Sequence, residues 1–188
     1  MNTEILDKQV IIIDSDKCPF KSGTNYDYYF DFKTPIKNAL FIKLIESTVV
    51  VNNLYGGSYT NQDSINININ DYKRVAVNNT NVQDNDYITN YFDTISIDTS
   101  KYLQEYILYT ANPAARPATI NYTFKNDYSS DTDINSPSMF VLNPVEPSLK
   151  RFNITAYDKT NALLTKTNIQ KIVIKLCIYT NRRKLTMD

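Results

Sequence analysis

Carboxylate pairs are the residues of this sequence whose type and spacing could do chemistry. Asp84 lies two positions before Asp86, and Asp131 lies two positions before Asp133. Neighbouring carboxylates can bind a hard cation or act as acid and base in hydrolysis. Neither segment supplies the glycine and the glutamate that a calcium-binding EF-hand loop needs. We therefore interpret both pairs as solvated loop residues and expect no metal and no other cofactor.

The chain contains no histidine. This excludes Ser-His-Asp and Cys-His nucleophile systems and every imidazole metal site. Gly56 and Gly57 form an isolated pair after Tyr55, which indicates a turn and not a phosphate-binding loop. The sequence therefore predicts that the protein is not an enzyme. An enzyme with two carboxylates on a β scaffold is the remaining catalytic alternative.

Tyrosine and a basic tail are the residues most suited to contacts with other molecules. The chain has 15 tyrosines, some of them clustered. A tyrosine ring offers a flat apolar face with a polar tip, as protein-binding and sugar-binding surfaces do, although ordinary strand packing also uses it. The tail could touch acidic neighbours or nucleic acid, or could be a free charged end. The candidate interface residues are Tyr26, Tyr28, Tyr55, Tyr59, Arg182, Arg183 and Lys184.

Charge, length and cysteine content describe the setting in which these residues act. The 188 residues suit one domain spanning 1–188, with short N-terminal and basic C-terminal tails. Lys plus Arg equals Asp plus Glu, 20 against 20, so we expect no nucleic-acid partner. No run of residues is long and apolar enough for a transmembrane segment. Cys18 and Cys177 are interpreted as reduced thiols, with a bridge between them as the alternative.

Apolar residues recur mostly with a period of two, which is typical of half-buried strands. Residues 64–70 alternate strictly, with Ile65, Ile67 and Ile69 on one face. Tyr28 shares a face with Phe30 and Phe32 in the same way, and further alternating segments lie near residues 92–97, 120–124 and 152–154. Shorter strands are predicted at 10–13, 72–77 and 139–142. The pattern predicts about eight to ten strands.

Two longer apolar runs indicate central strands. Residues 39–51 are nearly continuous in apolar and β-branched residues, which predicts a strand covered on both faces. Residues 170–180 place Ile172, Ile174, Leu176 and Ile178 in one register, and we assign that register to the core. Only residues 99–110, with Ser100 as a possible N-cap, suit a short helix. The fold class is therefore all-β, an antiparallel β-sandwich.

The segment from Phe140 to Asp158, FVLNPVEPSLKRFNITAYD, carries a resemblance to a known family. With the following strand, which completes a hairpin, it resembles the C-terminal half of single jelly-roll capsid proteins of nucleocytoplasmic large DNA viruses. The shared pattern is a Pro-rich corner, here Pro144 and Pro147, then a strand from Leu149 that ends in Tyr-Asp. The family's Asp-Gly turn is replaced by residues 158–161. The resemblance covers about the last 50 residues well.

This resemblance implies a single jelly roll and a structural role in an icosahedral capsid, as a penton or minor capsid protein. Its partners would be the major capsid protein, minor capsid proteins, or its own copies in a pentamer. It would reside in the virion capsid and be assembled in the host cell interior. A carbohydrate-binding β-sandwich on a virion surface or fibre is the alternative, for which tyrosine clusters and an Asp-lined cation site would be the features.

Overall fold

Antiparallel strands make up most of the chain that the computed structural model describes, which comprises residues 6–21, 23–52, 64–78, 88–97, 121–131, 136–166 and 169–181. This confirms the predicted all-β class. A single 3-10 turn, η1 (Ser15–Lys17), follows the first strand. The strands are β1 (Leu6–Asp14), β2 (Asp27–Asn52), β3 (Ser64–Ile69), β4 (Val75–Asn78), β5 (Ile88–Tyr91), β6 (Asp93–Ser96), β7 (Asn121–Asp127), β8 (Met139–Tyr157) and β9 (Ile169–Asn181).

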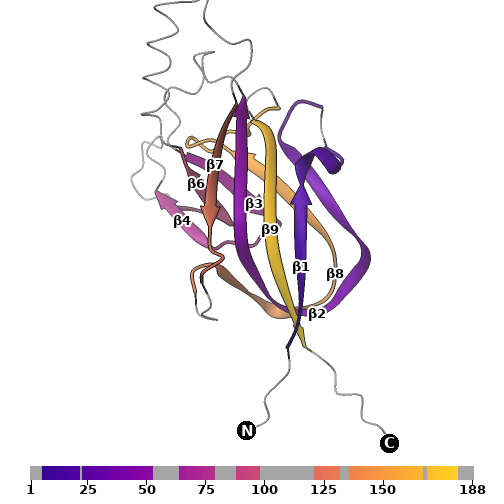
Figure 1. Cartoon of the computed structure of the whole chain (residues 1–188). Helices are drawn as coiled ribbons and strands as arrows, with labels where there is room; N and C mark the ends of the chain where they lie inside the picture. Colours follow the sequence, from indigo (N-terminus) through magenta and orange to yellow (C-terminus); the bar gives the residue numbers. More distant parts are fainter. Residues whose placement is uncertain are drawn as a thin grey trace, which may run out of the picture.

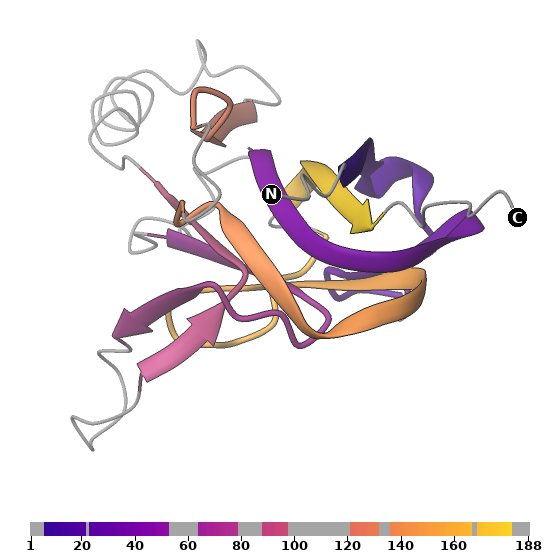
Figure 2. The same ribbon diagram turned by 90° about the horizontal axis from the view of Figure 1, so that it is seen from below.

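Seven of these strands form one curled sheet in the order β1-β9-β2-β8-β3-β6, and β7 pairs with the end of β2. The strands β4 and β5 form a separate two-stranded sheet. Figure 2 shows β2, in purple, arching over the orange β8, so that the sheet folds back on itself. This curled antiparallel sheet is consistent with a β-sandwich or jelly-roll-like fold.

The curl gives the sheet two layers that face each other (Figures 1 and 2). We call β1, β9, β7 and the second half of β2 (residues 39–52) the front layer. The back layer contains the first half of β2 (residues 27–36), the second half of β8 (residues 149–157), β3 and β6. One hydrophobic core lies between them and takes residues from both layers. The long strand β2 therefore belongs to both layers and joins them.

The alternating patterns predicted the inward faces of two strands correctly. Ile172, Ile174, Leu176 and Ile178 of β9 are all buried, with at most 1% of their surface exposed. The isoleucines of β3 are buried in the same way. An i, i+2 pattern places these side chains on one side of a strand, where the opposite layer covers them.

The second half of β2 departs from its predicted two-sided burial. Its inward residues change parity, from Ile42 and Leu44 to Ser47 and Val49. The register against β9 shifts between Leu44 and Glu46, so Ile45 is an extra residue in a bulge. The near-continuous apolar run thus arises partly from a change of face. Of the outward residues of this strand, Lys43 is buried and the others, such as Phe41, are half-buried.

The last two strands do not form the predicted hairpin. β2 lies between β8 and β9 and pairs with both. After β8 the chain turns at Asp158, whose Oδ1 accepts hydrogen bonds from the amides of Thr160 (2.8 Å) and Ala162 (2.9 Å). Asn161 adopts a φ of 63°, the left-handed conformation that glycine takes in such turns. The turn is tight, yet the chain then crosses over to the far side of β2.

The Pro-rich corner lies inside β8 and not between two separate strands. β8 runs unbroken from Met139 to Tyr157, but its register against β2 jumps between the pairs Ala39↔Glu146 and Phe41↔Val141. Pro144 falls in this irregularity, where a missing amide donor costs the ladder nothing. At this point the strand passes from the front layer, where residues 139–141 pair with residues 41–43 of β2, to the back layer.

Candidate functional site

Apolar side chains cross the outer surface of the front layer in register. Tyr179 of β9 is paired with Phe41 of β2, and Phe41 is paired with Val141 of β8. Directly paired residues point to the same face of a sheet. Val141 is 56% exposed, whereas Phe41 and Tyr179 are half-buried. Val10 and Ile12 of β1 lie on the same face in other registers, paired with Cys177 and Lys175 of β9. We call Val10, Ile12, Phe41, Val141 and Tyr179 the front strip.

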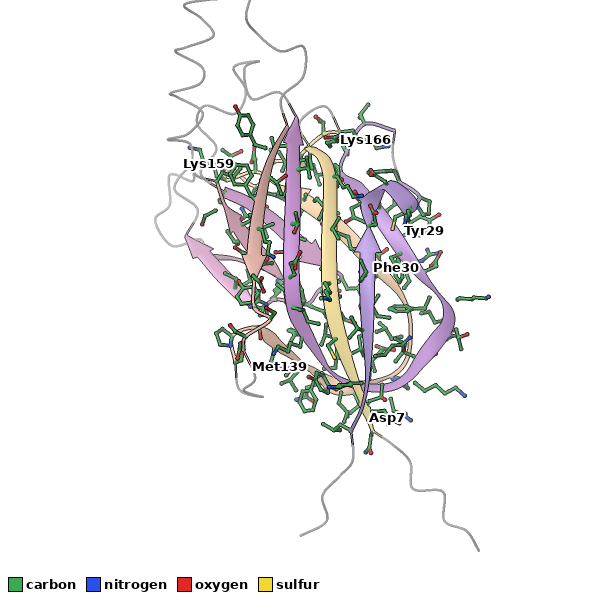
Figure 3. All side chains as sticks on the ribbon, viewed as in Figure 1. Asp7, Tyr29, Phe30, Met139, Lys159 and Lys166 are labelled. Atoms are coloured by element: carbon green, nitrogen blue, oxygen red, sulfur yellow. The ribbon has the colours of Figure 1, made fainter. Side chains whose placement is uncertain are left out.

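The front strip ends at β1, the outermost strand of this layer (Figure 1). Val10 and Ile12 are 52% and 60% exposed, because the core-facing residues of β1 are Ile11 and Ile13. Figure 3 places Asp7 at the start of β1, beside the end of β9. An exposed aliphatic surface at a sheet edge is typical of a protein-binding surface.

The outer surface of the back layer is polar and hollowed. An open groove of about 650 Å³ lies over β3 and β8. Asn68 and Thr155 are paired across these strands and both line it. At one end Asn70 Oδ1 accepts a hydrogen bond from the amide of Asn153 at 2.7 Å. The other lining residues are Lys21, Asn70, Asp71, Tyr72, Glu146, Arg151, Asn153 and Tyr157.

Several polar groups of this groove are available to a ligand. The side-chain amide of Asn68 and the hydroxyls of Thr155 and Tyr157 make no hydrogen bond to another described residue, and all three residues are half-buried. The Arg151 guanidinium, in contrast, is held by Asp31 through contacts of 2.5 and 3.0 Å and lies 4.1 Å over the Tyr29 ring. The groove therefore offers uncharged donors and acceptors beside an arginine whose charge is already balanced.

A buried ion pair lies between the layers. Asp93 begins β6, and its carboxylate is 1% exposed. Arg74, which is 4% exposed, contacts Asp93 Oδ1 through a guanidinium nitrogen at 2.9 Å. Asn126 and Tyr128 donate to the same carboxylate at 3.2 to 3.3 Å, and the Ser47 hydroxyl donates to its second oxygen. The guanidinium also donates to the Phe92 carbonyl at 2.9 Å and to the Pro137 carbonyl.

This network satisfies its charges and leaves no free acid or base. Both carboxylate oxygens of Asp93 accept hydrogen bonds from protein donors, so no reacting group could approach them. The network instead fastens β2, β6 and the end of β7 to one another, across the interior of the sandwich. We did not predict it. The alternation of residues 92–97 could have indicated it, because Asp93 lies on the same face as Ile95 and Ile97, and all three are buried.

The tyrosines predicted at an interface lie in the core where the structure describes them. Tyr26 is 1% exposed and Tyr28 is fully buried, so neither ring contributes to the surface of the chain. Their rings pack edge to face at 5.7 Å, and Phe20 completes the cluster. The period-two alternation, which puts Tyr28 on the same face as Phe30, predicted the position of Tyr28 better than the clustering of tyrosines did.

Burial governs the chemistry of this aromatic cluster. It raises the pKa of the Tyr26 and Tyr28 hydroxyls well above the ordinary value. The Tyr26 hydroxyl lies 2.5 Å from Ser15 Oγ, which also accepts a hydrogen bond from the amide of Ile172. The Tyr28 hydroxyl has no hydrogen-bond partner among the described residues.

The remaining candidates are placed only in part. Tyr55, Tyr59, Arg182, Arg183 and Lys184 lie outside the described residues, as do Asp84, Asp86, Asp133 and the helix considered at 99–110. Asp131 accepts a hydrogen bond from the Ser138 hydroxyl at 2.9 Å. Cys18 and Cys177 are free and buried, so the alternative of a bridge between them is not seen.

No group of three or more Cys, Asp or Glu side chains among the described residues is arranged to hold a metal ion. No helix in that part of the chain has the length and apolarity needed to cross a membrane.

Comparisons with known proteins give little further information. No protein-family profile matches the chain, and no curated protein matches it in sequence. Among solved structures, the decameric BFDV capsid protein aligns over 93% of this chain and 95% of its own, at 8% identity and a TM-score of 0.18. A superposition of that quality identifies neither a shared fold family nor a function.

Proposed function

We propose that this chain is a structural subunit of the icosahedral capsid of a large DNA virus, where it acts as a minor capsid or penton protein that holds other capsid proteins together. The observation that carries the proposal is the front strip. A sheet face that would otherwise be solvated presents Val10, Ile12 and Val141 at 52 to 60% exposure, and the half-buried rings of Phe41 and Tyr179 lie on the same face. Permanent subunit contacts use aliphatic and aromatic surface of this kind.

The resemblance of residues 140–158 to single jelly-roll capsid proteins supports the viral part of the proposal. The corner and the strand after it form one element, β8, which passes from the front layer to the back layer. A strand that takes part in both layers contributes to both outer faces of the sandwich, so it suits a scaffold that contacts different neighbours on its two sides. The buried charge pair of Arg74 with Asp93 fastens strands to one another, which is a structural use of buried charge.

The capsid proposal is tested by locating the chain in intact particles. Purified virions of the source virus are analysed by mass spectrometry for copy number and by density maps for position. We expect a fixed copy number and a density for this sandwich between major capsid oligomers or at vertices, with the front strip covered. Absence of the chain from the particles, or a soluble host-cell form with a measurable substrate, would overturn the proposal.

The polar groove favours a second candidate function, carbohydrate binding on the virion surface. Sugars present many hydroxyl groups that both donate and accept, and the uncharged amide of Asn68 and hydroxyls of Thr155 and Tyr157 can bond to them. Tyr72 and Tyr157 add aromatic rings against which an apolar sugar face could pack. The groove is open and about 650 Å³ in volume, which suits a short saccharide.

A glycan array, probed with and without calcium, tests this second function. We expect the unaltered chain to bind a subset of glycans. The Thr155→Leu variant should lose this binding, because leucine fills the groove floor with an apolar group. Thr123→Leu is the matched control, because Thr123 is exposed on β7, in the front layer. Absence of binding by the unaltered chain, or equal binding by both variants, would remove the carbohydrate function.

A further inference from the structure

Among the described strands, the outer edge of β1 is an unpaired strand edge, which native proteins usually block or cover. β1 pairs with β9 on one side only, and no other described strand pairs with it. Alternate residues of an edge strand direct their N–H and C=O groups outward, where they can pair with another strand. Residues 7–10 and Ile12 are exposed, and β1 contains no proline and no bulge that would block pairing.

The sequence of β1 is complementary to itself in one antiparallel register. A two-fold axis normal to the sheet keeps the outer face of both copies on one side, so that outward residues meet outward residues. When the axis passes through Ile11, Val10 of one copy lies opposite Ile12 of the other, and Lys8 lies opposite Asp14. Aliphatic residues then pair with each other, and charges pair with opposite charges, which stabilises cross-strand neighbours.

Neighbouring registers lack this complementarity. An axis through Val10 places Lys8 opposite Ile12, and an axis through Ile12 places Val10 opposite Asp14. Each of these arrangements sets a charge against an exposed aliphatic side chain on both sides of the axis. A shift by one residue would set outward residues against inward ones, which a half-buried sheet does not tolerate. The pattern of β1 therefore selects the register centred on Ile11.

The charge around Asp14 also suits an incoming lysine. Within the chain Lys171 contacts both Asp14, at 2.9 Å, and Asp16, at 3.4 Å, so one ammonium serves two carboxylates. The Lys8 ammonium of a second copy would bring a further positive charge to this acidic pair. Lys8 itself is exposed, and no ion pair within the described residues holds it.

We propose that β1 pairs with β1 of a second copy of this chain, antiparallel and centred on Ile11, to form an isologous dimer with one sheet continuous across the axis. The dimer joins the front strips of the two copies. The pairing itself does not depend on the proposed function, but its meaning for a capsid does. A two-fold contact favours a minor capsid protein that bridges neighbouring oligomers, because a penton ring needs heterologous contacts.

Disulfide trapping with mixed single variants tests this register. Val10→Cys and Ile12→Cys are purified separately, mixed in equal amounts and oxidised mildly. We expect a crosslinked dimer that contains one chain of each kind, because these two positions lie directly opposite, and far slower crosslinking of either variant alone. Thr123→Cys mixed with Lys125→Cys is the control for random collision, because both positions are exposed on β7.

A second measurement keeps the test decisive if a variant is unstable. Light scattering of the unaltered chain should show a dimer that dissociates on dilution. Lys8→Glu should weaken the dimer about tenfold or more, and Lys125→Glu should leave it unchanged. A monomer at all concentrations, or crosslinks between like positions only, would overturn the β1 pairing. Neither result bears on whether the chain is in the virion, so the capsid proposal succeeds or fails separately.

Discussion

The two outer faces of one continuous sheet differ in what they present to other molecules. The front face carries Val10, Ile12 and Val141, all more than half exposed, together with charged residues such as Lys8 and Lys171. The back face carries the amides, hydroxyls and balanced charges of the groove, with Asn68 and Thr155 at its floor. Both faces cover the same core, so the difference cannot come from the needs of folding. Exposed aliphatic side chains suit contact with another protein, and uncharged polar groups suit water or a polar ligand.

The strand β2 makes this difference most visible, because it contributes to both faces. Its first half turns Asp27, Tyr29 and Asp31 outward, and its second half turns Phe41 outward. Figure 3 labels Tyr29 and Phe30, which belong to the curved first half of this strand. A single strand can thus serve two surfaces when bulges and curvature change the direction of its side chains.

The largest difference in stability is expected between substitutions on the inner side and on the outer side of the front layer. Ile174→Asp places a charge in the core, where Ile174 is 1% exposed, and should unfold the chain. Ile12→Asp, on the outer side of the same layer, should change the free energy of unfolding by less than about 0.5 kcal/mol. Denaturant unfolding of the dilute variants measures both. Similar stabilities for the two would mean that the assigned faces are wrong.

The next largest effect should come from the ion pair that joins the layers. Arg74→Met leaves the Asp93 carboxylate buried without a cation and should lower the free energy of unfolding by about 3 to 5 kcal/mol. The matched control is Arg151→Met on the back face, where the pair with Asp31 is about half exposed and should cost about 1 kcal/mol or less. Equal losses in urea unfolding would show that burial of the first pair is not what matters.

The stability of the interior should also fall at alkaline pH. Burial, with the charges of Asp14 and Asp31, raises the pKa of the Cys18 thiol from 9.0 to about 11, and burial raises the pKa of Tyr26 and Tyr28. The unfolded chain therefore releases these protons at a lower pH than the folded chain. The free energy of unfolding should then decrease as pH rises above about 9.

Urea unfolding at neutral pH and at several values up to about 11 measures this decrease, and ultraviolet absorbance of phenolate follows the tyrosines. Cys18→Ser is the control, because it removes the thiol contribution and should flatten the first part of the decrease. A free energy of unfolding that stays constant over this range would contradict the assigned burial of the cluster.

The inward faces of regular strands could be predicted from the sequence, but the places where a strand changes direction could not. Strict alternation predicted the inward faces of β3 and β9, because no other periodic structure gathers those side chains on one side. It could not predict the bulge at Ile45 or the crossing from β8 to the far side of β2. Both depend on which strands become neighbours, and that is decided by packing between distant segments.

The candidate site was harder to predict, because composition was given more weight than parity. Clustered tyrosines suggested a surface, but Tyr28 shares its face with Phe30 and Phe32 and lies in the core. The front strip has no motif at all. It appears only when Tyr179, Phe41 and Val141, from three different strands, are brought into register.

The smallest predicted effect separates the two buried tyrosines. Tyr28→Phe removes a hydroxyl that is buried without a hydrogen-bond partner among the described residues, so the variant should be as stable as the unaltered chain or more stable, by up to about 1 kcal/mol. Tyr26→Phe removes a hydroxyl that lies 2.5 Å from Ser15 Oγ and should lose about 1 kcal/mol. The two substitutions delete the same atom, so they differ only in its partner. Thermal and urea unfolding of both variants measure the difference, and a larger loss for Tyr28→Phe would mean that the Tyr28 hydroxyl has a partner, such as a buried water, between the layers.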